Sequence, residues 1–229
     1  MATVEGLKLS EQFPRGGASI FVKALTIAPG QQVYFCGEDT NKLQVLFRYL
    51  TGEMKCETGT KWLDGVDVSH LDCRGLLRLG VAAGSARSRV FVSLTIEEHF
   101  QIRAAALQSP QSADYWLSRA RESFSVLRSV PRTVCGNFSG GEQQTLMLAL
   151  ATMGSSRIVI LEEPWTGLSG AAQQDVHEVF KRFKDGGITV VCLTQDKPKQ
   201  YGESSLIVDL DNPKSFDMSK SSSVRPKLV

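Results

Sequence analysis

The chain has 229 residues, of which 42% are hydrophobic and 22% charged, values that fit one large or two small globular domains with a buried core. Twenty-six Lys and Arg against 24 Asp and Glu leave a formal net charge of +2, which offers no excess of positive charge for nucleic acid. The longest apolar runs, such as 146–150 and 158–161, fall far short of the ~20 residues that span a bilayer. We therefore expect neither nucleic-acid binding nor direct membrane insertion.

The cysteines and the N-terminus indicate an intracellular, reducing compartment. The first six residues lack the apolar run of a secretory signal and the Arg-rich pattern of a transit peptide. The five cysteines are odd in number and show no paired spacing, and Cys36 and Cys192 lie in apolar, strand-like contexts. We expect reduced thiols that pack as small hydrophobic side chains.

The first elements in chain order form a strand–loop–helix unit. Residues 32–36 are a short apolar run between turn residues, which is typical of a buried strand. Apolar residues then recur at helical spacing over 43–50, and the pattern stops at Gly52. This order predicts a βα unit.

The middle of the chain is predicted to be helical, and a second α/β part follows it. Thr95 fits the N-cap of one helix, a second is expected over 113–130, and a third begins after Ser139. The apolar runs 158–161 and 188–193 are typical of central parallel strands, with an amphipathic helix between them. The tail from about 212 is rich in Ser and Lys, and we expect it to be disordered or to wrap a partner. The predicted parts are therefore 1–93, 94–150, 151–211 and 212–229.

Two motifs carry a family resemblance. Residues 137–144 (Asn-Phe-Ser-Gly-Gly-Glu-Gln-Gln) and 157–164 (Arg-Ile-Val-Ile-Leu-Glu-Glu-Pro) resemble the signature motif and the Walker B strand of ATP-binding cassette (ABC) ATPases. The resemblance extends over about 4–210, the whole of a minimal cassette. It implies an α/β fold like that of P-loop NTPases, with a mostly parallel sheet and an inserted helical subdomain.

The phosphate loop departs from the family pattern at nearly every position. A P-loop needs glycines whose amides face the phosphates, a Lys for the β/γ oxygens and a Ser or Thr for Mg²⁺. Of these, only Gly37 is present. The resemblance places Thr40 and Lys42 at glycine positions, Leu43 at the lysine position and Gln44 at the hydroxyl position.

Charge around this loop also opposes a triphosphate. Glu38 and Asp39 add negative charge, so we expect no nucleotide or metal in cis, and ATP with Mg²⁺ only where a partner subunit binds it. Phe13 lies 16 residues before Pro29 and is a candidate for stacking on adenine, with core packing as the alternative.

The catalytic positions are altered as well. Glu163 stands where the family has its general base, and Glu162 where the Mg²⁺-facing aspartate would be. Gln195 replaces the switch histidine and cannot carry its charge. Without a phosphate cradle we expect these carboxylates to serve as polar lining at the end of a strand, so no catalytic residue is expected.

The loop 80–89 lies at the place of the family's Q-loop but contains no glutamine. We expect its Arg87 and Arg89 to be solvated loop residues. The three histidines have no companion at metal-ligand spacing, so no metal site is expected.

The signature segment has two competing interpretations. Ser139 and Glu142 fit a capping box that satisfies the first amides of a helix. In the family, the same helix N-terminus faces a γ-phosphate held by the opposite subunit, which would involve Ser139, Gly140, Gly141 and Gln143. Both interpretations require the same residues and remain open at this point.

Three functions follow from the resemblance. The first is a catalytically inactive accessory or scaffold subunit, bound to other protein subunits of a membrane-associated complex, most simply an integral membrane protein. The second is a degenerate half of a heterodimeric transporter that completes the ATP site of an intact ABC ATPase partner. The third is an active transport ATPase. A weaker similarity to the short haem-exporter cassette of cytochrome c maturation raises the matrix side of the mitochondrial inner membrane as a location.

Overall fold

The computed structural model of the chain describes residues 2–13, 16–55, 58–87, 90–130, 133–154, 156–196 and 205–212, and over 3–24 it describes the backbone alone. The tail that we expected to be disordered therefore lies outside the described residues, apart from its first position. Within the described ranges, no helix combines the length and apolar content needed to cross a membrane.

A parallel sheet of five strands forms the centre of the molecule. Its strands, in spatial order, are β6 (Val81–Ser85), β7 (Ile158–Glu162), β8 (Thr189–Thr194), β3 (Gln32–Cys36) and β9 (Leu206–Asp209). Every residue of β3 and β8 is buried, which explains why both read as continuous apolar runs. The predicted strands at 32–36, 158–161 and 188–193 are confirmed, as is the mostly parallel core.

A second, antiparallel sheet was missed by the sequence interpretation. Its strands are β1 (Ala2–Phe13), β2 (Gly16–Ile27), β4 (Thr58–Leu63) and β5 (Val66–Asp67), in the order β2-β1-β4-β5. Charged residues and glycines interrupt apolar alternation in the first two strands, so period-2 patterning does not single them out.

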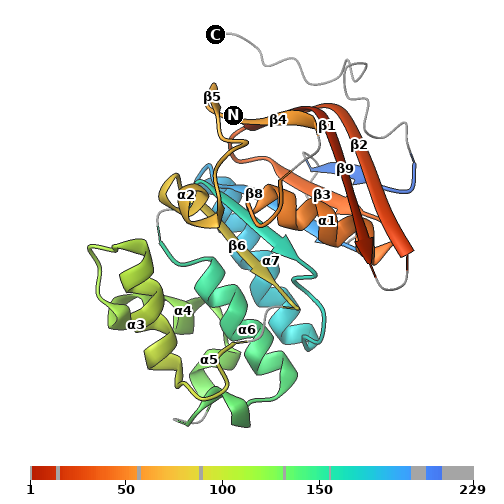
Figure 1. Cartoon of the computed structure of the whole chain (residues 1–229). Helices are drawn as coiled ribbons and strands as arrows, with labels where there is room; N and C mark the ends of the chain where they lie inside the picture. The colour runs from red at the N-terminus through yellow and green to blue at the C-terminus, as the bar shows by residue number, and fades with distance from the viewer. Residues whose placement is uncertain are drawn as a thin grey trace.

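Helices occupy two regions around the parallel sheet. Helices α1 (Thr40–Leu50), α2 (Cys73–Arg78) and α7 (Gly170–Asp185) belong to the α/β parts. The helical part contains α3 (Ile96–Leu107), α4 (Ala113–Ser123), α5 (Val126–Ser129), the 3₁₀ turn η1 (Cys135–Asn137) and α6 (Gly140–Ala151). Figure 1 shows the antiparallel sheet at one end of the molecule and the helical part at the other.

The prediction of a single helix over 113–130 is wrong in one respect. The segment forms two helices, α4 and α5. Phe124 leaves the helical conformation (φ −123°, ψ 106°) and buries its side chain in the core. The carboxylate of Asp175 on α7 accepts hydrogen bonds from the amide and hydroxyl of Ser125, at 2.7 and 2.6 Å. Tertiary contacts therefore compensate the break.

The two faces of the parallel sheet belong to two hydrophobic clusters. Along β3, Tyr34 and Cys36 face the cluster shared with α3 to α7, whereas Val33 and Phe35 face the cluster shared with α1 and the antiparallel sheet. This alternation follows from the period of two in a strand. Helix α6 seats closely on β6, because a Cβ added at Gly84 would lie 2.9 Å from the Cβ of Ala151.

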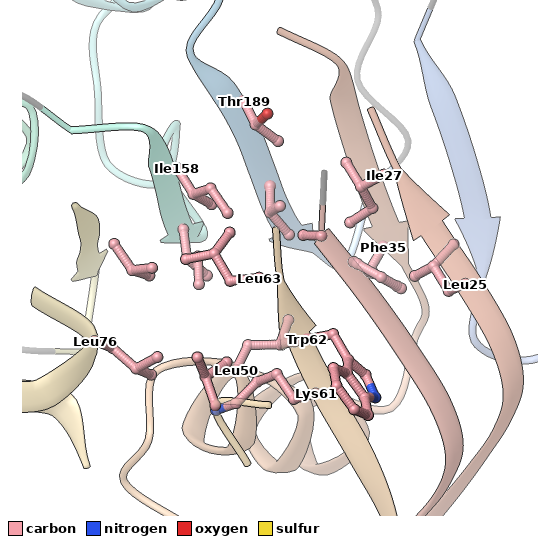
Figure 2. Close-up of a pocket in the computed structure, with 15 residues that line it drawn as sticks. Leu25, Ile27, Phe35, Leu50, Lys61, Trp62, Leu63, Leu76, Ile158 and Thr189 are labelled. Carbon is pink, nitrogen blue, oxygen red and sulfur yellow. The ribbon is translucent and has the colours of Figure 1, made fainter. Parts of the chain in front are cut away.

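A small apolar cavity lies in the seam between the two sheets (Figure 2). Leu25, Ile27, Phe35 and Leu63 project towards it from β2, β3 and β4. Its volume of about 60 Å³ is roughly that of two water molecules in the liquid. A nucleotide does not fit in a cavity of this size, because small-molecule sites typically have about 300–1,000 Å³.

Candidate functional site

Polar residues gather where β3, β7 and β8 end, because the carboxyl ends of parallel strands meet at one edge of the sheet. The loop after β3 leads directly into α1, which begins at Thr40. Asp39 is the N-cap of this helix, and its side chain accepts a hydrogen bond from the amide of Asn41 at 2.9 Å. A carboxylate of the chain itself thus lies at the positive end of the helix dipole.

A second carboxylate, which the sequence interpretation missed, contacts the same loop from another segment of the chain. Asp211, just after β9, accepts a hydrogen bond from the amide of Glu38 at 2.7 Å and forms an ion pair with Lys42 Nζ at 3.1 Å. Both contacts hold the pKa of Asp211 below its ordinary value, the amide contributing most. A Cβ at Gly37 would lie 3.0 Å from the Cβ of Leu210 and 3.2 Å from the carboxylate, so glycine favours this close approach.

The remaining loop positions also serve the fold. Leu43, at the family's lysine position, is 1% exposed and belongs to the core cluster behind α1. Thr40 and Gln44 lie half-buried at the start of that helix. Lys42 is the cation nearest the loop in sequence, and its ammonium is engaged by Asp211 and by the carbonyl of Leu210, at 3.5 Å.

At the end of β7, Glu162 is almost completely buried and paired. Its Oε2 accepts a hydrogen bond from the hydroxyl of Ser85, and its Oε1 forms an ion pair with Arg87 Nε at 3.1 Å. The expectation that Arg87 is simply solvated is therefore wrong, because the parallel pairing of β6 with β7 brings its guanidinium to a buried carboxylate. Arg89 lies outside the described residues.

Glu163 is held by neighbours from two other segments. Its carboxylate accepts hydrogen bonds from the amide of Gln195 at 2.7 Å and from the hydroxyls of Thr194 and Thr166, at 3.2 and 3.3 Å. Its backbone has φ of 50°, a left-handed conformation that is uncommon for a residue with a Cβ. The amide group of Gln195 in turn donates from Nε2 to the carbonyl of Glu38 at 3.4 Å, which links β8 to the loop after β3.

The capping box predicted at the start of α6 is confirmed. The Ser139 hydroxyl accepts from the Glu142 amide at 3.3 Å, and the Glu142 carboxylate accepts from the Ser139 amide at 2.7 Å. Gln143 donates to the carbonyls of Cys135 and Phe138, so its side chain secures the turn before the helix.

The surface of this helix start is open. Ser139 and Gly140 are exposed, and a Cβ added at Gly140 would meet nothing within 4 Å. One at Gly141 would lie 3.0 Å from the carbonyl oxygen of Gly167. Gln144, one turn further along α6, donates to the Glu163 carbonyl at 3.3 Å and thereby ties the helical part to β7.

Two further expectations concern adenine stacking and metal binding. The side chain of Phe13, proposed to stack on adenine, lies outside the described residues. Within the described ranges, no group of three or more His, Cys, Asp and Glu side chains gathers as metal ligands would.

Replacing Asp211 with Asn is expected to cost about 1 kcal/mol of unfolding free energy at pH 7, since the variant loses a half-exposed ion pair. Because the folded-state pKa of Asp211 is lowered, this contribution is complete above the ordinary aspartate pKa of about 4 and is lost as pH falls through the lowered value. Urea unfolding at pH 7 and near pH 2 measures the difference, with exposed Asp196→Asn as the control. An equal cost at both pH values would contradict the contact.

Comparisons with known proteins agree with this architecture. The model of the ABC transporter family matches residues 23–166. The chain is 24% identical over 173 residues to the high-affinity branched-chain amino acid transport ATP-binding protein BraG of Pseudomonas aeruginosa, covering 76% of this chain and 74% of that protein. It is 26% identical over 179 residues to the xylose import ATP-binding protein XylG of Escherichia coli, covering 74% of this chain and 34% of that protein.

Solved structures show the same fold at low sequence identity. The ATP-binding cassette MJ1267 of an ABC transporter superposes with a TM-score of 0.75 at 15% identity, over 92% of this chain and 87% of that one. The cassette MJ0796, solved as a post-hydrolysis dimer with ADP and phosphate, gives 0.69 at 19% identity, over 86% and 88%.

The chain belongs to the ABC transporter family, and its fold is that of the ATP-binding cassette. The family resemblance and the fold class predicted from the motifs are thereby confirmed. The weaker similarity to haem exporters and the mitochondrial location find no support in these relatives, whose names concern branched-chain amino acid and xylose transport.

Proposed function

We propose that this protein is a non-catalytic cassette subunit of a membrane-associated complex. The observation that carries the proposal is that groups around the family's nucleotide site are bound to one another. Asp211 accepts a hydrogen bond from the amide of Glu38 and forms an ion pair with the ammonium of Lys42, and Arg87 forms an ion pair with Glu162.

Because of these contacts, a triphosphate would fit poorly at the loop after β3. Phosphate binding needs unengaged backbone amides and a cation, whereas one amide and the ammonium of this loop already face a carboxylate. A metal ion at Glu162 would have to displace the Arg87 guanidinium, which already neutralises that carboxylate. Glu163, at the position of the general base, accepts three hydrogen bonds from its own chain, which engage the carboxylate that would have to orient a water molecule.

Calorimetry with Mg-ATP tests the proposal directly. We expect a dissociation constant no better than about millimolar, or roughly 4 kcal/mol, and no turnover, because phosphoryl transfer depends on charge stabilisation that Leu43 and Gln195 cannot supply. A micromolar dissociation constant would contradict the proposal. Hydrolysis that Glu163→Gln abolishes would instead establish the active transport ATPase.

A second function is favoured by the open start of α6. Ser139 and Gly140 are exposed, and nothing within the described residues covers the space beside Gly140. The chain could therefore present this helix N-terminus to nucleotide held by an intact cassette, as half of a heterodimer.

Gly140→Asp separates the two functions in the native complex. For a scaffold we expect assembly and ATPase activity of the host complex to be unchanged, with a cost of about 1 kcal/mol or less in the stability of this chain. In a heterodimer, the new carboxylate would repel the partner-held phosphate and abolish ATPase activity while the complex stays assembled. Loss of ATPase activity would therefore contradict the scaffold function and support the half-transporter function.

The partners follow from the family. ABC cassettes work with membrane permease components, so we propose that an integral membrane protein or its complex holds this chain at a membrane surface. The transported substrates in the names of BraG and XylG are not carried over, because fold and family do not determine substrate.

A further inference from the structure

A pocket lies between α4, the end of α6 and α7, and none of the described residues that line it belongs to the nucleotide site. Its volume is about 220 Å³. That volume is roughly that of seven water molecules in the liquid and lies just below the range of about 300–1,000 Å³ for drug-sized ligands. The pocket therefore has room for a small organic molecule.

Apolar side chains form a large part of the pocket wall. Phe124 and Met153 are buried in the core cluster that the helical part shares with α7, and Trp116 and Phe183 pack against that cluster at its edge. The indole of Trp116 is fixed in place, because its Nε1 donates a hydrogen bond to the hydroxyl of Ser109 at 2.8 Å. A wall of this kind favours a ligand with a hydrocarbon part, which removes apolar surface from water when it binds.

The charged groups of the pocket are two arginines, and the described residues that line it include no carboxylate. Arg119 on α4 forms an ion pair with Glu122 at 2.7 Å. Arg182 on α7 forms no ion pair within the described part of the chain, and its Nε donates to the carbonyl of Glu178 at 3.4 Å. Its two terminal nitrogens can therefore bind an anion, and a guanidinium binds a carboxylate best, through two parallel hydrogen bonds.

We propose that this pocket binds a small amphiphilic carboxylate, whose charged group contacts Arg182 and whose hydrocarbon part packs against Trp116 and Phe183. The positive charge of the two arginines favours an anion, and the apolar wall favours one that carries a hydrocarbon chain. Because α4 and α7 both line the pocket, its ligand would hold the helical part against the α/β part. The inference goes beyond the proposed function and does not depend on it.

Calorimetry of the purified full chain with octanoate gives the first test. We expect a dissociation constant of about 1 mM or lower. Octan-1-ol, which has a similar hydrocarbon chain and no charge, should bind at least about tenfold more weakly, because the charge-assisted hydrogen bonds are absent. Equal affinities for the two ligands overturn the proposal, as does the absence of octanoate binding. Inorganic phosphate that binds as tightly as octanoate also overturns it, because the apolar wall would then contribute nothing.

Three variants assign the binding to this pocket. Arg182→Met should weaken octanoate binding about tenfold and leave octan-1-ol binding unchanged, a difference that general damage to the fold would not produce. Phe183→Ala should weaken the binding of both ligands. Arg128→Met is the matched control, because Arg128 on α5 is also exposed but does not line the pocket. If Arg182→Met binds octanoate as tightly as Arg128→Met does, the proposal is wrong.

Melting and hydrogen exchange test whether the ligand joins the two parts. At about a tenfold excess over the dissociation constant, octanoate should raise the melting temperature by about 3–6 °C, since a ligand that binds the folded state stabilises it by mass action. Arg182→Met should lose most of this rise, and Arg128→Met should keep it. Backbone amides of both α4 and α7 should gain protection from exchange. An equal rise in Arg182→Met, or protection confined to one of the two helices, overturns the proposal.

Discussion

Replacing Arg87 with Met is expected to lower the free energy of unfolding by about 2 kcal/mol. The reason is that Glu162 is only 2% exposed, and removal of its guanidinium partner leaves a buried carboxylate that has only the Ser85 hydroxyl. Loss of a partner in a fully buried pair costs about 3–5 kcal/mol, and the 45% exposure of the Arg87 side chain reduces that figure. Equilibrium unfolding in urea measures the change.

The double variant Arg87→Met with Glu162→Gln tests the cause. A neutral amide at 162 needs no counter-charge, so the double variant should recover at least half of the lost stability. Arg119→Met removes an exposed pair with Glu122 and should cost less than about 1 kcal/mol. If Arg87→Met costs no more than Arg119→Met, Arg87 does not compensate the buried carboxylate. The argument that Arg87 takes the place of a metal ion at Glu162 is then lost.

The second large effect is expected from Gly84→Val. A Cβ at this position of β6 would lie 2.5 Å from Met147 Sδ and 2.9 Å from the Cβ of Ala151, both on α6. Overpacking of this kind costs about 3 kcal/mol, which corresponds to a fall of roughly 6–12 °C in melting temperature. Because Met147 is flexible and Ala151 is not, we expect the methionine to move and the helix to remain strained.

Gly170→Val is the matched control, since a Cβ there meets nothing within 4 Å at the exposed start of α7. Adding Met147→Ala to Gly84→Val should restore part of the stability by making room at the contact. Calorimetric melting of the four proteins distinguishes overpacking from a general effect of valine. A melting temperature for Gly84→Val equal to that of Gly170→Val would mean that α6 does not seat closely on β6.

Local patterns in the sequence predicted much of the fold. The buried strands at 32–36, 158–161 and 188–193 follow from uninterrupted apolar runs, and the capping box at Ser139 and Glu142 follows from contacts three residues apart. The loss of the phosphate-loop residues could also be predicted, because the sequence itself shows that position 43 is not a lysine. Such features depend on near neighbours in the chain.

The tertiary structure alone decided what occupies the altered site. Asp211 and Glu38 are 173 residues apart. Of the residues that pair with Glu162, Ser85 ends β6, 77 positions earlier in the chain, and Arg87 follows that strand. Strand order determines these neighbours, and one sequence contains no local signal for the placement of β9 beside β3 or β6 beside β7. The sequence thus predicted which groups the site lacks, whereas long-range strand pairing determined that Asp211 and Arg87 lie in their place.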